Sequence, residues 1–312
     1  MTWRAMCGGP YKRYLHVVAM ERHSGAALGR RDTLAALHAH VAAVGNPNPM
    51  LLTGAAGTGK STVLAMLVNE LQTSGGSGRA AGSAGAGPSG GSEDPAAAAA
   101  AAPEPFILAH TFGLCGQSDD FRRVLLRLCT ELKLRFNIYV ELPATLAAVG
   151  AALPRFLQHA ALFGKVVLIL DGLERAEMHG VTMEEWLPPS LPLACRVIVA
   201  ATRCRAVTAM RERSGGGSGG GGGEGGGGGG GGLLAEVAMP PLTGEERRGI
   251  VKHALGTVGG GSLSVGALAP LLEADDAGSP MYLLLAVQEI KARVAEEQDV
   301  HGRGGTLLQC SA

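Results

Sequence analysis

A run of eight residues starting at position 54 has the spacing of a phosphate-binding loop. Gly54-Ala55-Ala56-Gly57-Thr58-Gly59-Lys60-Ser61 fits the pattern G-x-x-x-x-G-K-[ST], whose glycines let backbone N–H groups turn toward phosphates. Lys60 can reach the β- and γ-phosphates, and the Ser61 hydroxyl is a suitable Mg²⁺ ligand. We therefore expect a site for ATP or ADP with Mg²⁺, formed by Gly54, Ala55, Ala56, Gly57, Thr58, Gly59, Lys60, Ser61 and Thr62.

Two carboxylates further along the chain complement this loop. Asp171 follows five apolar residues, so we expect it at the carboxyl end of a buried strand, beside the loop, as a second Mg²⁺ ligand. Glu174 could orient or deprotonate the attacking water, and the alternative is an exposed acid at a helix start. With Lys60, these two residues predict hydrolysis of ATP.

Another expected strand ends in Thr202-Arg203. A polar or cationic side chain at this place would lie near the γ-phosphate and respond to its hydrolysis. Arg203 is therefore a candidate sensor, and the alternative is an ordinary surface arginine.

Short apolar runs alternate with helical patterns over most of the chain. Strands that are apolar on both faces and separated by helices are typical of a parallel sheet covered on both sides. One strand lies between the two motifs, which predicts an α/β P-loop NTPase sheet of strand order 5-1-4-3-2. We expect the strands at Met50–Thr53, Phe106–Ala109, Val166–Leu170, Arg196–Ala201 and Leu234–Ala238. One expected helix, Leu142–Phe163, should be kinked or divided at Pro154.

Glycine-rich tracts and a change in pattern suggest the domain limits. Glycine fills 16 of the 19 positions at 214–232, and another low-complexity tract covers 74–104. Both tracts fall between a helix and the following strand, where insertions leave the opposite sheet edge undisturbed. The expected division is a poorly defined N-terminal segment 1–27, a P-loop NTPase domain 28–240 with these two insertions, a helical domain 241–298 and a flexible tail 299–312.

At this point the motifs resemble those of a known family. The phosphate loop, Asp171-Gly172-Leu173-Glu174, Ala201-Thr202-Arg203 and Gly278-Ser279-Pro280 occur in the order seen in STAND-class P-loop NTPases of the NACHT type, which include nephrocystin-3-like proteins. Gly29-Arg30-Arg31 is similar to the family's G-R-E element near the base, and Trp186-Leu187-Pro188-Pro189 to a further family element.

The resemblance implies slow hydrolysis and a role in signal transduction, with Pro280 packing against the adenine. The alternative for Pro280 is a proline in the first turn of a helix that Ser279 caps. Trp186 is most simply a core aromatic.

Charge and composition restrict the partners and the location. Lys plus Arg and Asp plus Glu both number 27, so the basic excess needed for binding nucleic acid is missing. Neither a long apolar span nor a signal peptide is recognised, so we expect no membrane contact and a cytoplasmic location. The six cysteines lack metal-site spacing and are interpreted as small buried side chains, with a redox or zinc site as the alternative.

These patterns favour a nucleotide-operated switch that binds ATP and Mg²⁺, hydrolyses ATP slowly, and acts through a protein partner or self-association. Two alternatives stay open. One is a scaffold that retains ADP without turnover, and the other is an AAA+-like remodelling ATPase acting on nucleic acid.

Overall fold

The computed structural model describes residues 30–45, 48–76, 104–114, 118–145, 148–188, 190–215, 234–255 and 268–306. The expected N-terminal segment 1–27, most of the tracts 74–104 and 214–232, and the end of the chain from 307 lie outside the described residues.

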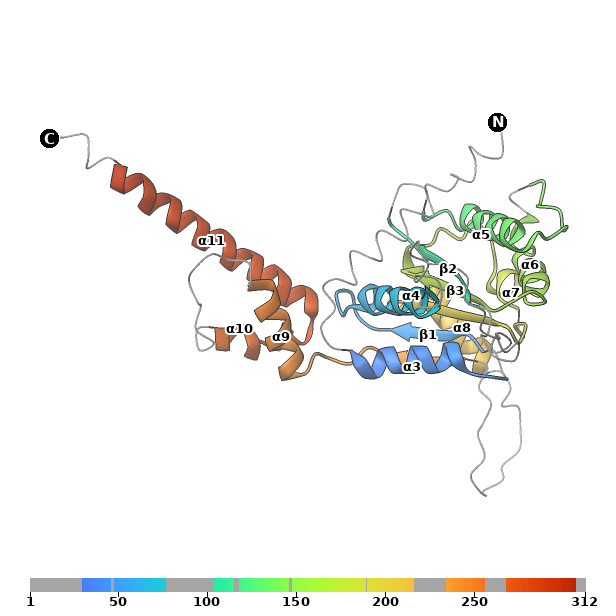
Figure 1. The fold of residues 1–312 in the computed structure, drawn as a ribbon, viewed down its shortest axis with the longest axis horizontal. Coiled ribbons are helices and arrows are strands. Elements are labelled where there is room, and N and C mark those ends of the chain that lie inside the picture. The colour runs from blue at the N-terminus through green and yellow to red at the C-terminus, as the bar shows by residue number, and fades with distance from the viewer. Residues whose placement is uncertain are drawn as a thin grey trace, which may run out of the picture.

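A five-stranded parallel sheet forms the centre of the protein (Figure 1). The strands lie in the order β2-β3-β4-β1-β5, which confirms the predicted α/β P-loop NTPase fold and the order 5-1-4-3-2. The middle strands β3 and β4 are buried along their whole length, as their apolar sequences require. The strands are β1 (Met50–Thr53), β2 (Phe106–Thr111), β3 (Val166–Asp171), β4 (Cys195–Ala201) and β5 (Ala235–Ala238).

Helices cover both faces of the sheet, and each face has its own hydrophobic cluster. Helices α3 and α4 pack on one face, whereas α5, α6, α7 and α8 pack on the other. Their bounds are α3 (Arg31–Ala42), α4 (Lys60–Gly76), α5 (Phe121–Phe136), α6 (Leu153–Ala160), α7 (Met183–Trp186) and α8 (Arg205–Gly215). Trp186 is fully buried against Phe121, with ring centroids 5.2 Å apart, so it is a core aromatic.

The helix expected over Leu142–Phe163 is much shorter in the structure. Among the described residues of this range, the only α-helix is α6, Leu153–Ala160, and Pro154 lies in its first turn rather than at a kink. Proline is tolerated in a first turn because the N–H groups there have no helical partner. The preceding described residues form turns whose apolar side chains, such as Val149, are buried without helical periodicity.

A separate group of helices follows β5 and has a hydrophobic cluster of its own. It consists of α9 (Gly244–Leu255), α10 (Ala269–Glu273) and the long α11 (Pro280–Thr306). Figure 1 shows α11 extending away from the sheet beyond α9 and α10. A capping box opens α9, because Thr243 Oγ1 accepts from the N–H of Glu246 at 3.2 Å and Glu246 accepts from the N–H of Thr243 at 2.8 Å.

A buried arginine joins α3 to the amino-terminal edge of β4. Arg196 is 2% exposed and donates hydrogen bonds to the carbonyl groups of Leu193, Cys195, His40 and Ala43. Its cation therefore lies at the carboxyl end of α3, where the helix dipole favours positive charge.

The described cysteines fit the interpretation as small apolar residues. Cys129 and Cys195 are buried free thiols, and burial raises the pKa of each to about 12. Cys204 is partly buried, whereas Cys7, Cys115 and Cys310 lie outside the described residues. Within the described ranges, no helix is both long and apolar enough to cross a membrane.

Candidate nucleotide site

The phosphate loop, the ends of β2 and β3, and the first turns of α11 enclose a pocket of about 510 Å³. It lies at the carboxyl edge of the parallel strands, where ligands bind in folds of this class. The side chains that can do chemistry here are Lys60, Ser61, Thr62, Thr111, Asp171, Glu174 and Arg175. The remaining lining residues are Ala56, Gly57, Gly59, Phe112, Gly113, Leu114, Gly172, Pro280, Met281 and Leu284.

The loop from Gly54 to Ser61 has the backbone shape that its glycines predict. Gly57 and Gly59 have φ values of +79° and +94°, which residues with a Cβ rarely adopt. Thr58 closes the turn by donating its hydroxyl to the carbonyl of Ala55 at 2.8 Å, and α4 begins at Lys60. The loop therefore leads directly into a helix amino terminus, whose N–H groups and dipole favour an anion.

Lys60 lies across this loop. Its ammonium donates to the carbonyl groups of Gly54 and Ala55 at 2.8 and 2.9 Å. Burial lowers the pKa of Lys60, and the negative charges of Glu174 and Asp171 act in the opposite direction. Three loop residues expected to bind nucleotide, Gly54, Ala55 and Thr58, thus shape the loop and hold Lys60 without lining the pocket.

The two predicted carboxylates both line the pocket, but one is buried and the other is exposed to solvent. Asp171 ends β3 and is 3% exposed, whereas Glu174 is exposed on the short 3-10 helix η3 (Leu173–Arg175). The carboxylate of Glu174 accepts a hydrogen bond from the N–H of Thr202 at 3.1 Å, which connects η3 to the end of β4. The Ser61 hydroxyl and the Asp171 carboxylate are hard oxygen ligands in one pocket, a donor set that suits Mg²⁺.

Arg203 is the predicted catalytic residue that the structure does not bring to this pocket. It is exposed just after β4 and is not among the lining residues, although its neighbour Thr202 holds Glu174. Its role as a sensor stays a prediction.

The first turn of α11 rests on the phosphate loop. The Met281 N–H and the Ser279 hydroxyl both donate to the carbonyl of Gly57, at 3.3 and 3.2 Å. A Cβ at Gly57 would lie 2.9 Å from the Met281 Cβ, and one at Gly59 would lie 3.6 Å from the Pro280 Cγ. Pro280 does begin the helix, but the Ser279 side chain bonds to the loop instead of capping α11.

Arg30 forms another connection between the loop and the helical region. Its N–H donates to Glu246 at 2.7 Å, and its guanidinium donates to the carbonyl groups of Thr58 at 3.1 Å and of Pro240. Burial acts to raise the pKa of Glu246, but the N–H groups of Thr243 and Arg30 hold it below its ordinary value. Gly29, the first residue of the G-R-E-like element, lies outside the described residues.

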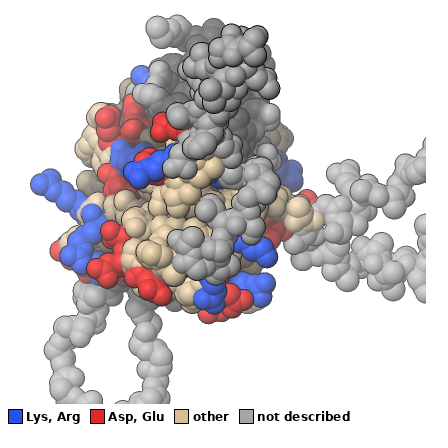
Figure 2. Space-filling view, turned by 90° about the vertical axis from the view of Figure 1, so that its left-hand side faces the viewer, with Lys and Arg blue, Asp and Glu red and all other residues tan. Residues whose placement is uncertain are grey.

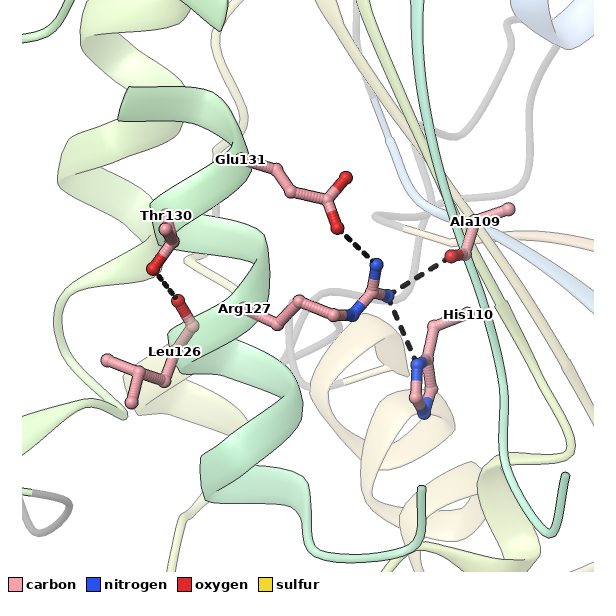
Figure 3. A network of polar contacts seen from close by, with 6 residues as sticks. All are labelled: Ala109, His110, Leu126, Arg127, Thr130 and Glu131. Atoms are coloured by element: carbon pink, nitrogen blue, oxygen red, sulfur yellow. Dashed lines mark hydrogen bonds and ion pairs between the residues drawn. The ribbon is translucent and has the colours of Figure 1, made fainter. Parts of the chain in front are cut away.

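A buried polar network behind β2 was not recognised in the sequence (Figure 3). The Arg127 guanidinium on α5 donates to the Ala109 carbonyl and to His110 Nδ1, both at 3.1 Å, and pairs with Glu131. His110 Nε2 then donates to the Ser118 carbonyl at 2.8 Å, which anchors the loop after β2. This loop supplies pocket residues from Phe112 to Leu114. The only signal in the sequence was a charged pair spaced four residues apart on a helix, which is common on exposed surfaces.

The family comparison agrees with this geometry. A family model described as an AAA ATPase domain matches residues 27–199, which is more than half of the chain. The chain belongs to the AAA ATPase domain family. It is thus an ATP-binding P-loop NTPase, and its membership points to ATP hydrolysis. The match does not by itself confirm the NACHT type.

Solved structures similar to this AAA ATPase domain protein are distant. An Orc1 protein of Aeropyrum pernix in complex with DNA is 15% identical with a TM-score of 0.48, covering 86% of this chain and 61% of that one. A Walker-type ATPase of Pyrococcus abyssi is 13% identical with a TM-score of 0.45, covering 91% of this chain and 77% of that one. This chain therefore spans about 61% of the length of the Orc1 protein. No curated protein matches the chain.

Proposed function

We propose that this protein is a nucleotide-operated switch of the STAND class and NACHT type, which binds ATP with Mg²⁺ and hydrolyses ATP slowly. One observation carries the proposal: the phosphate loop, both carboxylates and the first turns of α11 line a single pocket. Because Met281 and Ser279 bond directly to the carbonyl of Gly57, a shift of the loop on nucleotide exchange would shift α11.

The chemistry follows from the side chains in the pocket. The loop N–H groups and Lys60 would hold the phosphates, and Ser61 and Asp171 would hold Mg²⁺, which supplies charge neutralisation when bound. In hydrolysis, the water oxygen bonds to the γ-phosphorus, and the bond to the bridging oxygen breaks with its electron pair left on ADP. Glu174 would orient this water and accept its proton.

We assign the parts of the chain accordingly. Residues 28–240 would form the nucleotide-binding domain and 241–298 the helical domain, whose separate hydrophobic cluster supports this division. Pro280 lies against the loop at Gly59, which is compatible with a contact to bound nucleotide. Arg203 would respond to the γ-phosphate only if its exposed side chain turns inward.

The proposed partner is a protein or a second copy of the chain, in the cytoplasm. Leu285, near the start of α11, is exposed outside the nucleotide pocket, and it lies close in sequence to Met281 and Leu284, which are exposed and line that pocket. On the face that Figure 2 shows, basic and acidic side chains are interspersed, without a continuous basic surface among the described residues. With zero net charge, this distribution favours a protein partner over nucleic acid.

Binding and turnover test this function separately. Mg²⁺-dependent binding of ATP and ADP is measured by titration calorimetry, beside phosphate release from the same samples. Lys60→Ala should abolish binding, whereas Glu174→Gln should keep binding and lose release. Tightly retained ADP with no release from the wild type would favour the scaffold instead, and folded protein without any nucleotide affinity would refute both readings.

A further inference from the structure

The nucleotide pocket contains a second cation, Arg175, for which the sequence motifs assign no role. Arg175 is the last residue of η3 and directly follows Glu174. It lines the pocket together with Lys60, at the side formed by the loop after β2. The pocket therefore has two positive side chains, which reach it from the ends of two different strands.

The backbone of Gly113 forms a seat for the Arg175 side chain. A Cβ built at Gly113 would lie 2.8 Å from the Arg175 Cδ and closer still to one guanidinium nitrogen. Only glycine leaves room for this approach, and Gly113 also has a φ of +77°. The N–H of Gly113 donates to the Asp119 carboxylate, so this seat is itself anchored.

Glu174 and Arg175 are adjacent in sequence but are directed to opposite sides of the pocket. Glu174 bonds to the Thr202 N–H at the end of β4, whereas Arg175 lies on Gly113 beyond the end of β2. Among the described residues, no carboxylate lies within ion-pair distance of the Arg175 guanidinium. An exposed guanidinium that lines the pocket and has no carboxylate partner among the described residues suits the bidentate binding of a phosphate.

We propose that Arg175 binds the terminal phosphate of ATP in the pocket of its own chain and so distinguishes ATP from ADP. This inference rests on the proposed nucleotide function. ADP lacks the phosphate that Arg175 would contact, so the arginine favours the ATP-bound state alone. A guanidinium at this place also stabilises the charge that spreads over the γ-phosphate oxygens during hydrolysis.

Calorimetric titrations with Mg²⁺ and either ADP or β,γ-imido-ATP, which is not hydrolysed, test the inference. Arg175→Ala should weaken binding of β,γ-imido-ATP by about tenfold or more, the effect expected for a lost charged hydrogen bond, and change ADP binding by less than about twofold. Arg175→Lys should retain part of the preference for β,γ-imido-ATP, because lysine keeps the positive charge but cannot donate two parallel hydrogen bonds as a guanidinium does. Arg155→Ala, at an exposed arginine on α6, is the matched control and should change neither affinity.

A second variant tests the seat. Gly113→Ala should displace the Arg175 guanidinium and so reduce the preference for β,γ-imido-ATP over ADP, as Arg175→Ala does. The double variant should lose little more of this preference than either single variant. Gly45→Ala controls for backbone strain, since Gly45 has a φ of +103° but no atom within 4 Å of a built Cβ. Thermal unfolding of each variant checks that it folds.

The outcomes separate this inference from the proposed function. Suppose that the wild type binds both nucleotides and that Arg175→Ala weakens the binding of both equally, or of neither. Arg175 then does not contact the terminal phosphate, whereas the proposed function still stands. If Gly113→Ala reduces the preference for β,γ-imido-ATP equally in the wild type and in the Arg175→Ala variant, Gly113 does not act by positioning Arg175. If the wild type binds neither nucleotide, the proposed function itself fails.

Discussion

Replacing His40 should make the protein less sensitive to acid. His40 lies near the end of α3, and its Nε2 is buried without a hydrogen-bond partner among the described residues. Burial is the main cause that lowers its pKa from 6.5 to about 4, and the positive charges of Arg196 and Lys165 act in the same direction. A hydrogen bond with the backbone of Val197 opposes them.

The sign and size of the effect follow from these two pKa values. Above pH 6.5, the side chain is neutral in both the folded and the unfolded chain, so the full stability is present. As the pH falls toward 4, the unfolded chain takes up a proton that the folded protein does not, and stability is lost. At about 1.4 kcal/mol for each pKa unit, the whole difference corresponds to at most about 3 kcal/mol, and solvent screening at this half-buried ring reduces it.

Urea unfolding followed by circular dichroism, at several pH values between about 7.5 and about 4.5, measures this loss. His40→Leu removes the titrating group at a site that offers Nε2 no partner among the described residues. On acidification over that range, the stability loss of this variant should be smaller than that of the wild type by about 1–2 kcal/mol. His159→Gln changes an exposed histidine on α6 and should follow the wild-type profile. If His40→Leu and wild type lose the same stability on acidification, the burial argument for His40 is wrong.

Three further perturbations test the packing and the insertions. Trp186→Ala should lower the free energy of unfolding by about 3–5 kcal/mol in urea titrations, because it empties a fully buried site, and a loss below about 1 kcal/mol would contradict this packing. Arg127→Met should cost about 3–5 kcal/mol by leaving Glu131 and His110 without their buried partner, and the added change Glu131→Gln should restore part of it. Deletion of 214–232 should leave nucleotide affinity in calorimetry within about twofold, and a loss of about tenfold would show that this tract contributes to the site.

Local patterns were sufficient to predict the sheet and the phosphate loop. Most of the strands are short, mainly apolar runs, and the position of the Asp171 strand after an intervening strand implied the order that the structure confirms. The capping box at Thr243 is local in the same sense, because both of its partners lie within one helical turn. The helix over Leu142–Phe163 was wrong, since alanine and leucine suit a helix but also fill the buried turns that precede Pro154.

The fold class and the main residues of the candidate nucleotide site could be predicted from sequence patterns, because a phosphate loop and a strand-ending carboxylate are local features. Which distant side chains join these residues became visible in the three-dimensional fold. It brought Met281 and Ser279 onto the Gly57 carbonyl and Arg175 onto Gly113, and it left Arg203 outside the pocket. These placements depend on how turns direct side chains from the ends of different strands and helices, which no spacing along the chain encodes.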